Sequence, residues 1–318
     1  MRSVEEVITE ERLRDLLRSK EHPIAYIGYE PSGKLHLGHK IGIDKMRDLL
    51  AAGFEAFVLL ADIHAFLNEK GELGEIRKTA MENKRVFEAL GLEGARFILG
   101  GSTELDFSDK DGFQMSPDYQ ILWRSLAAHI SEQRAIRSVR ELARDPKKMK
   151  ASHIIYPVMQ VADIVKLDVD LAVGGMDQRH IHMLGEDVLH KLGYKTPVFL
   201  HLPIISDIRG EKKMASSFPQ ALIALDDPPE KIEEKIKKAI CPPTQVKGNP
   251  VLEIAEHHVF RWDNEITIGS SVITSYKQLR ELYAKGKIHP LDLKEAVAGE
   301  HARILEPVRK RFARSKLM

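Results

Sequence analysis

The sequence contains one cysteine, Cys241, in 318 residues. A single cysteine excludes a disulfide framework and any Cys-x-x-Cys zinc site, and it fits a reducing compartment. No apolar run approaches the roughly 18 residues that a membrane-spanning helix needs. The first residues, MRSVEEVITEERLRDLL, lack the apolar segment of a signal peptide. These absences predict a cytoplasmic protein without a membrane span.

The sequence also lacks an excess of positive or negative residues. The 48 Lys and Arg residues oppose 47 Asp and Glu residues, which leaves a net charge of +1. Any binding to nucleic acid must therefore come from local patches and not from the overall field. Hydrophobic residues make up 43% of the chain, which is ordinary for a globular protein. The length predicts two domains, or one large domain with an insertion.

Strand and helix patterns alternate in the first hundred residues. Apolar runs of strand length occupy 24–28, 57–62 and 95–100, and helical patterns follow the first two of them. Further strand signals appear at 169–175 and 197–205. Fully apolar strands that alternate with helices predict an α/β fold with a parallel sheet covered on both faces.

Two segments depart from this alternation. Residues 110–150 read as a long, basic helical insertion, and after 226–229 (DDPP) the pattern becomes charged amphipathic helices up to the end. We therefore expect a catalytic domain over 1–225 that carries the insertion, followed by an all-helical domain over 226–318.

The stretch PSGKLHLGH, residues 31–39, lies between the first strand and the first helix. His36 and His39 are three residues apart, so they share one face near the helix start. The free N–H groups of such a helix N-terminus attract phosphate. The histidines can hydrogen-bond the phosphates of ATP and stabilise charge at the α-phosphate. Two surface histidines are the plainer alternative, and a metal site is not predicted because no third ligand accompanies the pair.

A second stretch, GEKKMASS at 210–217, follows the last strand. Lysines and hydroxyls on a loop of small residues suit a mobile clamp on a leaving pyrophosphate. Together, HLGH and KMASS resemble the HIGH and KMSKS signatures of class I aminoacyl-tRNA synthetases. The resemblance implies a Rossmann-type catalytic domain, ATP with Mg²⁺ as substrate, and the catalytic residues His36, His39, Lys213, Ser216 and Ser217. Gly28 and Gly38 are expected at the ATP site with them.

The resemblance covers nearly the whole chain. AYIGYEPSGKLHLGH, LLADIHAFL, IIYPVMQVADI, AVGGMDQRHIHML and IHPLDLK resemble the tyrosyl-tRNA synthetases of the archaeal and eukaryotic type. This implies that Tyr26 and Asp163 meet the ring hydroxyl of tyrosine, with His64 in the same pocket. The amino group is expected to meet Tyr156, Gln160 and Gln178. The spacing of 156, 160 and 163 independently places these three side chains on one helix face.

Contacts to tRNA follow from the same resemblance. Arg137 and Arg179 match residues that read the first base pair of the acceptor stem, and the insertion forms much of the homodimer interface in the family. His289 and Asp292 match residues that contact the first anticodon base, for which Phe260 or Trp262 is a candidate stacking partner. The other basic residues of the insertion are expected to meet RNA phosphates in part: Arg124, Arg134, Arg140, Arg144 and 147–150. His180 and His182 are interpreted as structural or RNA-side residues and not as metal ligands.

The predicted function is that of a tyrosine–tRNA ligase, which makes tyrosyl-adenylate from L-tyrosine and ATP and then charges the 3′ end of tRNA(Tyr). Three alternatives stay open. Tryptophanyl enzymes share both signatures. Some nucleotidyltransferases for small molecules share H-x-G-H. The second signature usually has serine at the position of Ala215, so a catalytically silent RNA-binding relative is the third alternative.

Overall fold

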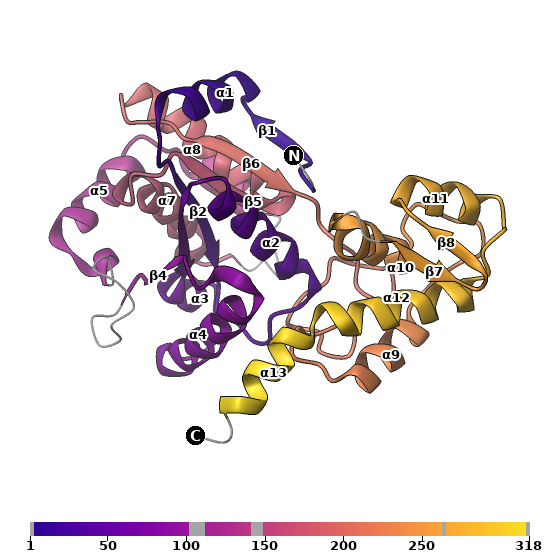
Figure 1. Ribbon diagram of the computed structural model, residues 1–318. Coiled ribbons are helices and arrows are strands. Elements are labelled where there is room, and N and C mark those ends of the chain that lie inside the picture. The colour runs from indigo at the N-terminus through magenta and orange to yellow at the C-terminus, as the bar shows by residue number, and fades with distance from the viewer. Residues whose placement is uncertain (1–2, 102–111, 141–148, 263–264, 316–318) are drawn as a thin grey trace.

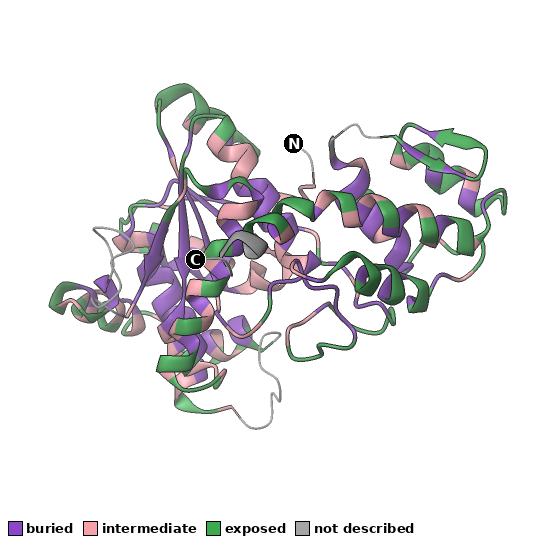
Figure 2. Ribbon diagram, turned by 60° about the horizontal axis from the view of Figure 1, so that its bottom comes forward, coloured by how far each residue is buried: buried purple, intermediate pink, exposed green. Residues whose placement is uncertain are grey.

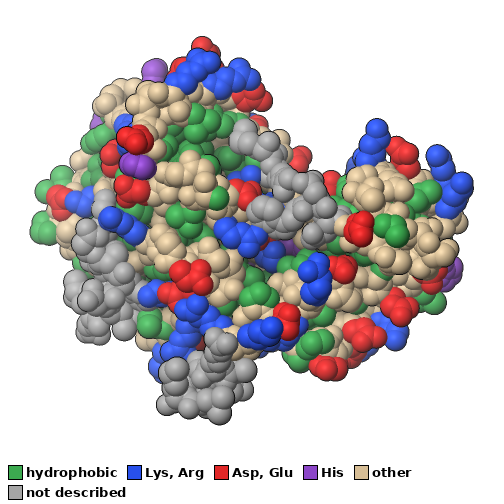
Figure 3. All heavy atoms as spheres, viewed as in Figure 1, with side chains coloured by type: hydrophobic (Ala, Val, Ile, Leu, Met, Phe, Trp, Pro, Cys, Tyr) green, Lys and Arg blue, Asp and Glu red, His purple; other side chains and the backbone are tan. Residues whose placement is uncertain are grey.

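The structure is a computed structural model that describes residues 3–101, 112–140, 149–262 and 265–315. Figure 1 shows an N-terminal body built around a sheet and a C-terminal body built mainly of helices, with α13 lying across towards the first body. Acidic and basic side chains are interspersed over the face shown in Figure 3. None of the helices in the described ranges is long and apolar enough to cross a membrane.

Six strands among the described residues form one sheet in the order β1-β6-β5-β2-β3-β4. Their bounds are β1 Glu6–Ile8, β2 Ile24–Tyr29, β3 Glu55–Leu60, β4 Arg96–Leu99, β5 Leu171–Gly175 and β6 Val198–Leu202. All neighbouring pairs are parallel except β1 and β6, which are antiparallel. The predicted parallel sheet is therefore confirmed for five strands. The edge strand β1 was not predicted, since its three residues are only partly buried and carry no apolar run.

Helices cover both faces of this sheet, and its five parallel strands are mostly buried (Figure 2). Neighbouring residues of β2 point to opposite faces, because side chains alternate along a strand. Ile27 joins the core that contains Ile41 of α2, whereas Tyr26 joins the core that contains Val161 of α7. The helices of this body are α1 Glu10–Ser19, α2 Leu37–Ala51, α3 Asp62–Leu67, α4 Leu73–Phe87, α7 Ala151–Lys166 and α8 Arg179–Lys191. Short turns of helix complete it at η1 Glu88–Leu92, η2 Phe113–Met115 and η3 Met176–Gln178.

The described part of the predicted insertion holds two helices, α5 Pro117–Ala127 and α6 Glu132–Val139, and not one long helix. The chain turns at Ser131, whose extended backbone ends the run of helical residues. Both helices pack against α7. Arg144, Lys147 and Lys148 lie outside the described residues.

The C-terminal region, defined here as residues 229–315, is mainly helical. A hairpin of β7 Ile266–Ile268 and β8 Ser271–Ile273 corrects the expectation of an all-helical domain. The hairpin forms because Ile266 and Ile268 alternate into the core and Gly269 takes the positive φ of the turn. The helices are α9 Pro229–Lys238, α10 Pro250–Ile254, α11 Tyr276–Ala284, α12 Pro290–Ile304 and α13 Glu306–Ser315, with short turns of helix at η4 Ala255–Val259 and η5 Phe260–Trp262.

Candidate active site

A cavity of about 450 Å³ opens at the carboxyl ends of the parallel strands. β2 lies between β3 and β5, so the chain connections leave in opposite directions at this point of the sheet. Open α/β sheets bind ligands at such a switch point. Both stretches singled out in the sequence line the cavity, together with residues of β2, α7 and the connection between β5 and α8.

His36 and His39 cap the first turn of α2 reciprocally. His36 is the N-cap residue, and its Nδ1 accepts a hydrogen bond from the backbone N–H of Gly38 at 3.2 Å. The backbone N–H of His36 donates in turn to Nδ1 of His39 at 3.1 Å. A side chain at Gly38 would lie about 3.1 Å from the His36 ring, which explains the glycine between the two histidines. The ring centroids lie 3.9 Å apart.

This capping fixes the protonation of both rings. Because each Nδ1 accepts a backbone proton, each neutral ring carries its hydrogen on Nε2. Burial holds the pKa of His36 well below its ordinary value and lowers the pKa of His39 to about 4. At neutral pH the pair therefore offers two uncharged Nε2–H donors and no positive charge.

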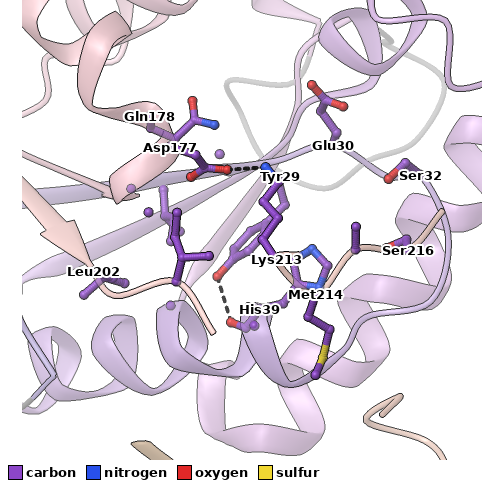
Figure 4. A pocket seen from close by; sticks show the side chains of 18 of the residues that line it. Tyr29, Glu30, Ser32, His39, Asp177, Gln178, Leu202, Lys213, Met214 and Ser216 are labelled. Atoms are coloured by element: carbon purple, nitrogen blue, oxygen red, sulfur yellow. Dashed lines mark hydrogen bonds and ion pairs between the residues drawn. The ribbon is translucent and has the colours of Figure 1, made fainter. Parts of the chain in front are cut away.

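Lys213 of the second stretch lines the same cavity as the start of α2, and its side chain reaches towards Asp177 (Figure 4). Its Nζ forms an ion pair of 2.7 Å with Oδ2 of Asp177, in the connection between β5 and α8. Ser216 donates to the carbonyl oxygen of Lys34 at 3.2 Å, which ties this loop to PSGK. Met214 is buried beneath the loop, whereas Ser217 is exposed at its surface. The two signatures predicted from the sequence thus meet in one cavity.

Most of the predicted tyrosine-binding residues line the same cavity: Tyr26, His64, Tyr156, Gln160 and Gln178. Gln160 donates to Gln178 at 3.3 Å, and the ring of His64 meets the edge of Tyr156 at a centroid distance of 4.8 Å. Gly28 also lines the cavity, and a side chain there would lie 2.9 Å from the hydroxyl of Tyr26. The strand β2 thus leaves room for the Tyr26 ring.

Asp163 lies behind the cavity wall and is fully buried. Its Oδ1 accepts hydrogen bonds from the Tyr119 hydroxyl and from Nε2 of Gln114, both at 2.7 Å. Oδ2 lies 3.5 Å from Nε2 of His64, and no described group forms a hydrogen bond with it. Burial raises the pKa of Asp163 to about 7 and lowers the pKa of His64 to about 4, so His64 is neutral beside it. Oδ2 is a buried acceptor that still needs a donor.

Tyr119 and Gln114 are functional candidates that the sequence analysis did not single out. Tyr119 lies on α5, in the segment interpreted there as a basic insertion, and Gln114 lies in η2 just before it. Both are buried beside Asp163. The only signal in the sequence was a tyrosine and a glutamine in a segment interpreted as a basic helical insertion. The packing of α5 on α7 brings them to the carboxylate.

The predicted tRNA-contacting residues lie away from the cavity lining. Arg137 is exposed on α6, beside His180 in a shallow hollow. Arg179 binds both carboxylate oxygens of Glu6 at 2.8 and 2.9 Å, a partner that the sequence did not suggest. His289 caps α12 by accepting from the backbone N–H of Leu291, and Asp292 is exposed one residue further on.

Two remaining expectations concern ring stacking and metals. Phe260 is half-buried against the core, and nothing is described of the Trp262 side chain. His182 is buried, and its Nδ1 lies 3.0 Å from Nε2 of His201, which supports a structural role. Within the described ranges no group of three or more His, Cys, Asp and Glu side chains is arranged to hold a metal ion.

Comparison with known proteins shows which chains this one is similar to. The model of the family described as tRNA synthetases class I (W and Y) matches residues 18–306. The tyrosine–tRNA ligase of Methanopyrus kandleri is 49% identical over 97% of this chain and 95% of its own. That of Methanocaldococcus jannaschii is 46% identical over 98% of this chain and 97% of its own. The crystal structure of tyrosyl-tRNA synthetase from Archaeoglobus fulgidus, complexed with L-tyrosine, has a TM-score of 0.90 at 46% identity and covers 98% of this chain and 96% of that one.

Proposed function

We propose a role for each site residue on the premise that the chain belongs to the class I tRNA synthetases for tryptophan and tyrosine. It is a tyrosine–tRNA ligase, which activates L-tyrosine with ATP and transfers the tyrosyl group to tRNA. The observation that carries the assignment of roles is the single cavity in which both signatures adjoin the Tyr26 pocket.

In the first step, the tyrosine carboxylate attacks the α-phosphate of ATP, which enters with Mg²⁺. A bond forms between the carboxylate oxygen and the α-phosphorus, and the bond from that phosphorus to the bridging oxygen breaks as pyrophosphate leaves. The neutral Nε2–H groups of His36 and His39 donate hydrogen bonds to phosphate oxygens as charge develops. Because the rings are uncharged, they contribute directed donors, and positive charge at the phosphates comes from Lys213 and the metal ion.

Lys213 acts on the leaving pyrophosphate. In the structure it pairs with Asp177, so we propose that it exchanges this carboxylate for the phosphates when ATP binds. Ser216 and Ser217 lie on the same loop and add hydroxyl donors. The half-exposed position of Lys213 suits such a movement, because a solvated ion pair costs little to break.

Tyrosine is recognised at both ends. Its ring hydroxyl donates to Oδ2 of Asp163 and meets the hydroxyl of Tyr26, which supplies the partner that the buried carboxylate oxygen lacks. Its ammonium group meets Tyr156, Gln160 and Gln178, whose oxygens are acceptors for its three donors. His64 packs beside Tyr156 as part of the pocket wall.

Binding of tRNA(Tyr) is assigned to residues of both bodies of the molecule. Arg137 and Arg179 contact the acceptor stem, and Arg179 exchanges Glu6 for RNA when it does so. His289 and Asp292 contact the first anticodon base, in a C-terminal region that serves as the anticodon-binding domain. The chain works as a homodimer through the helical insertion, in the cytoplasm where tRNA and ATP are available.

The test is tyrosine-dependent exchange of labelled pyrophosphate into ATP, measured with and without tRNA. The proposal predicts exchange with tyrosine in the absence of tRNA, and charging when tRNA(Tyr) is added. Exchange that tryptophan supports better than tyrosine would overturn the choice of amino acid. Binding of tRNA without exchange would indicate the silent RNA-binding alternative that Ala215 raised.

A further inference from the structure

The helix α2 carries charged residues on the face that it buries. Lys40, Asp44 and Asp48 follow one another at intervals of four residues, so they share one side of the helix. Nζ of Lys40 lies 2.6 Å from Oδ2 of Asp44, and the side chains are 3% and 0% exposed. The Lys40–Asp44 pair lies inside the protein, where an ion needs a partner, whereas the Asp48 side chain is 26% exposed.

Arg261, in η5 of the C-terminal region, reaches this face of α2. Its Nη2 lies 2.6 Å from Oδ2 of Asp48, and its Nε lies 3.6 Å from Oδ2 of Asp44. The guanidinium is fully buried, and 213 residues of chain separate it from Asp48. Lys45 and Arg47 add ion pairs to the same two carboxylates. The contact between the two bodies of the molecule is therefore made in part by buried charges.

Apolar packing alone would hold these bodies together in several similar arrangements. Buried ion pairs behave differently, because desolvation offsets most of their attraction unless the geometry is right. The guanidinium is planar and rigid, so a hydrogen bond from Nη2 to Asp48 together with the 3.6 Å ion pair between Nε and Asp44 restricts the orientation of α2. The cluster therefore specifies the position of α2 more than it adds stability.

The same helix begins at the ATP-binding histidines. His36 and His39 cap its first turn, and Asp48 lies 12 residues after His36, about 18 Å along a rigid helix axis. A shift or rotation of α2 at Asp48 is transmitted to both Nε2–H donors. Lys213 would follow such a shift only in part, because its loop is joined to Lys34 through Ser216 but is also held by Asp177 and by the backbone of Ile205.

We propose that Arg261 is a positioning residue for adenylate formation: by holding Asp44 and Asp48, it fixes His36 and His39 relative to Lys213. The inference rests on the proposed function, since it concerns the ATP step. It also gives the C-terminal region, to which the anticodon contact is assigned, a direct mechanical connection to the ATP site.

A second ion pair between the two bodies provides a matched control. Arg311 of α13 binds Glu88 at 2.9 Å and Glu93 at 3.3 Å, both in or beside η1. This pair crosses the same boundary, but it is partly exposed and its two carboxylates lie in and beside η1 and not on α2. If any ion pair between the two bodies supported adenylate formation, loss of Arg261 and loss of Arg311 would lower kcat to a similar extent.

The experiment compares Arg261→Met, Arg261→Lys and Arg311→Met in the full chain. Tyrosine-dependent pyrophosphate exchange gives kcat and the KM values for ATP and tyrosine, and thermal unfolding gives Tm. We expect Arg261→Met to lower kcat about 10- to 100-fold, because a misplacement of the donors of the order of 1 Å is costly. Arg261→Lys keeps the charge but not the fork, and we expect an intermediate loss. KM for tyrosine should stay unchanged in all three variants, and Arg311→Met should keep kcat.

If Arg261→Met does not fold, Arg261→Lys and Asp48→Asn carry the test in its place. A wild-type kcat in folded Arg261→Lys and Asp48→Asn, with only Tm lowered, would overturn the inference and leave a purely structural cluster. An equal loss of kcat in Arg311→Met would overturn it too. A wild-type chain without tyrosine-dependent exchange would instead overturn the proposed function, and the inference with it.

Discussion

Lys213 and Asp177 are joined by an ion pair of 2.7 Å that links the KMASS loop to the residue just before Gln178. The pair lies at the edge of the cavity that also holds His36 and His39 (Figure 4). Before ATP binds, the lysine is thus held close to the amino-acid pocket by a carboxylate that belongs to neither substrate. This arrangement leads to the first prediction.

Replacement of Lys213 by alanine should mainly lower kcat for adenylate formation. A lysine that meets pyrophosphate chiefly in the transition state contributes about 2–4 kcal/mol there and little to ground-state binding. Single-turnover measurement of tyrosyl-adenylate formation at saturating ATP checks this. Lys212→Ala, in the same loop, is the control and should stay near the wild type. A change confined to the KM for ATP would remove the transition-state role.

Replacement of Tyr119 by phenylalanine should weaken the choice of tyrosine over phenylalanine. The variant removes one of the two hydrogen bonds that hold Oδ1 of Asp163, and a hydrogen bond to a charged group contributes about 1.5–3 kcal/mol. We expect kcat/KM for tyrosine to fall about tenfold and Tm to fall with it. Tyr194→Phe, at an exposed tyrosine, is the matched control. Unchanged kinetics in Tyr119→Phe would show that Gln114 alone is sufficient.

The double substitution Tyr26→Leu with Asp163→Gly should reverse amino-acid choice. Phenylalanine fits wherever tyrosine fits, so its rejection depends on leaving the buried partners of the hydroxyl unpaired. Without those partners, we expect phenylalanines with an apolar para substituent to be activated and tyrosine largely to be lost. Pyrophosphate exchange with tyrosine, phenylalanine, tryptophan and para-methylphenylalanine is the measurement. If the double variant still strongly prefers tyrosine, Tyr26 and Asp163 do not recognise the ring hydroxyl.

Discrimination against phenylalanine should depend on pH through Asp163. Burial raises the pKa of this carboxyl to about 7 in the empty pocket. Above that pH the carboxylate accepts the hydroxyl of tyrosine and is left unpaired by phenylalanine. Below it, the carboxyl is neutral, so it pairs more weakly with the tyrosine hydroxyl and costs less to leave unpaired beside phenylalanine. The tyrosine-to-phenylalanine ratio of kcat/KM should therefore fall as pH is lowered from about 8.5 to about 6, by at most about tenfold per unit.

The neighbouring histidines do not contribute to this pH dependence. Burial lowers the pKa values of His39 and His64 to about 4, so neither residue titrates in that range, and the ATP step is shared by both amino acids. A ratio that stays constant from pH 8.5 to pH 6 would mean that Asp163 keeps one protonation state throughout.

Replacement of Asp292 by arginine should separate RNA recognition from tyrosine activation. The new donor fork would face the donor edge of guanine at the first anticodon position, where a carboxylate acceptor is expected. We predict weaker charging of tRNA(Tyr) and unchanged pyrophosphate exchange without tRNA. Glu295→Arg makes the same change of charge on an exposed residue of α12 and is the control. An equal loss in both assays of Asp292→Arg would point to misfolding.

The sequence by itself determined the elements that local chemistry specifies. Apolar runs marked the buried parallel strands, and the spacing of Tyr156, Gln160 and Asp163 placed them on one face of what is indeed helix α7. The two signature stretches predicted a class I synthetase, and five longer stretches predicted the tyrosine family, because motifs are local in the chain. The edge strand β1 and the hairpin β7–β8 were missed, since short strands with few apolar residues leave too weak a pattern.

Only the tertiary structure decided which distant residues meet, because a contact between elements leaves no period in the sequence. Tyr119 and Gln114 reach Asp163 from α5 and η2, and so give its Oδ1 two donors while Oδ2 is left for the substrate. Arg179 meets Glu6, and Arg261 meets Asp48, across 173 and 213 residues of chain. Burial then set the charge of each group: it kept His36 and His39 neutral and raised the pKa of Asp163, since desolvation depends on the whole fold around a side chain.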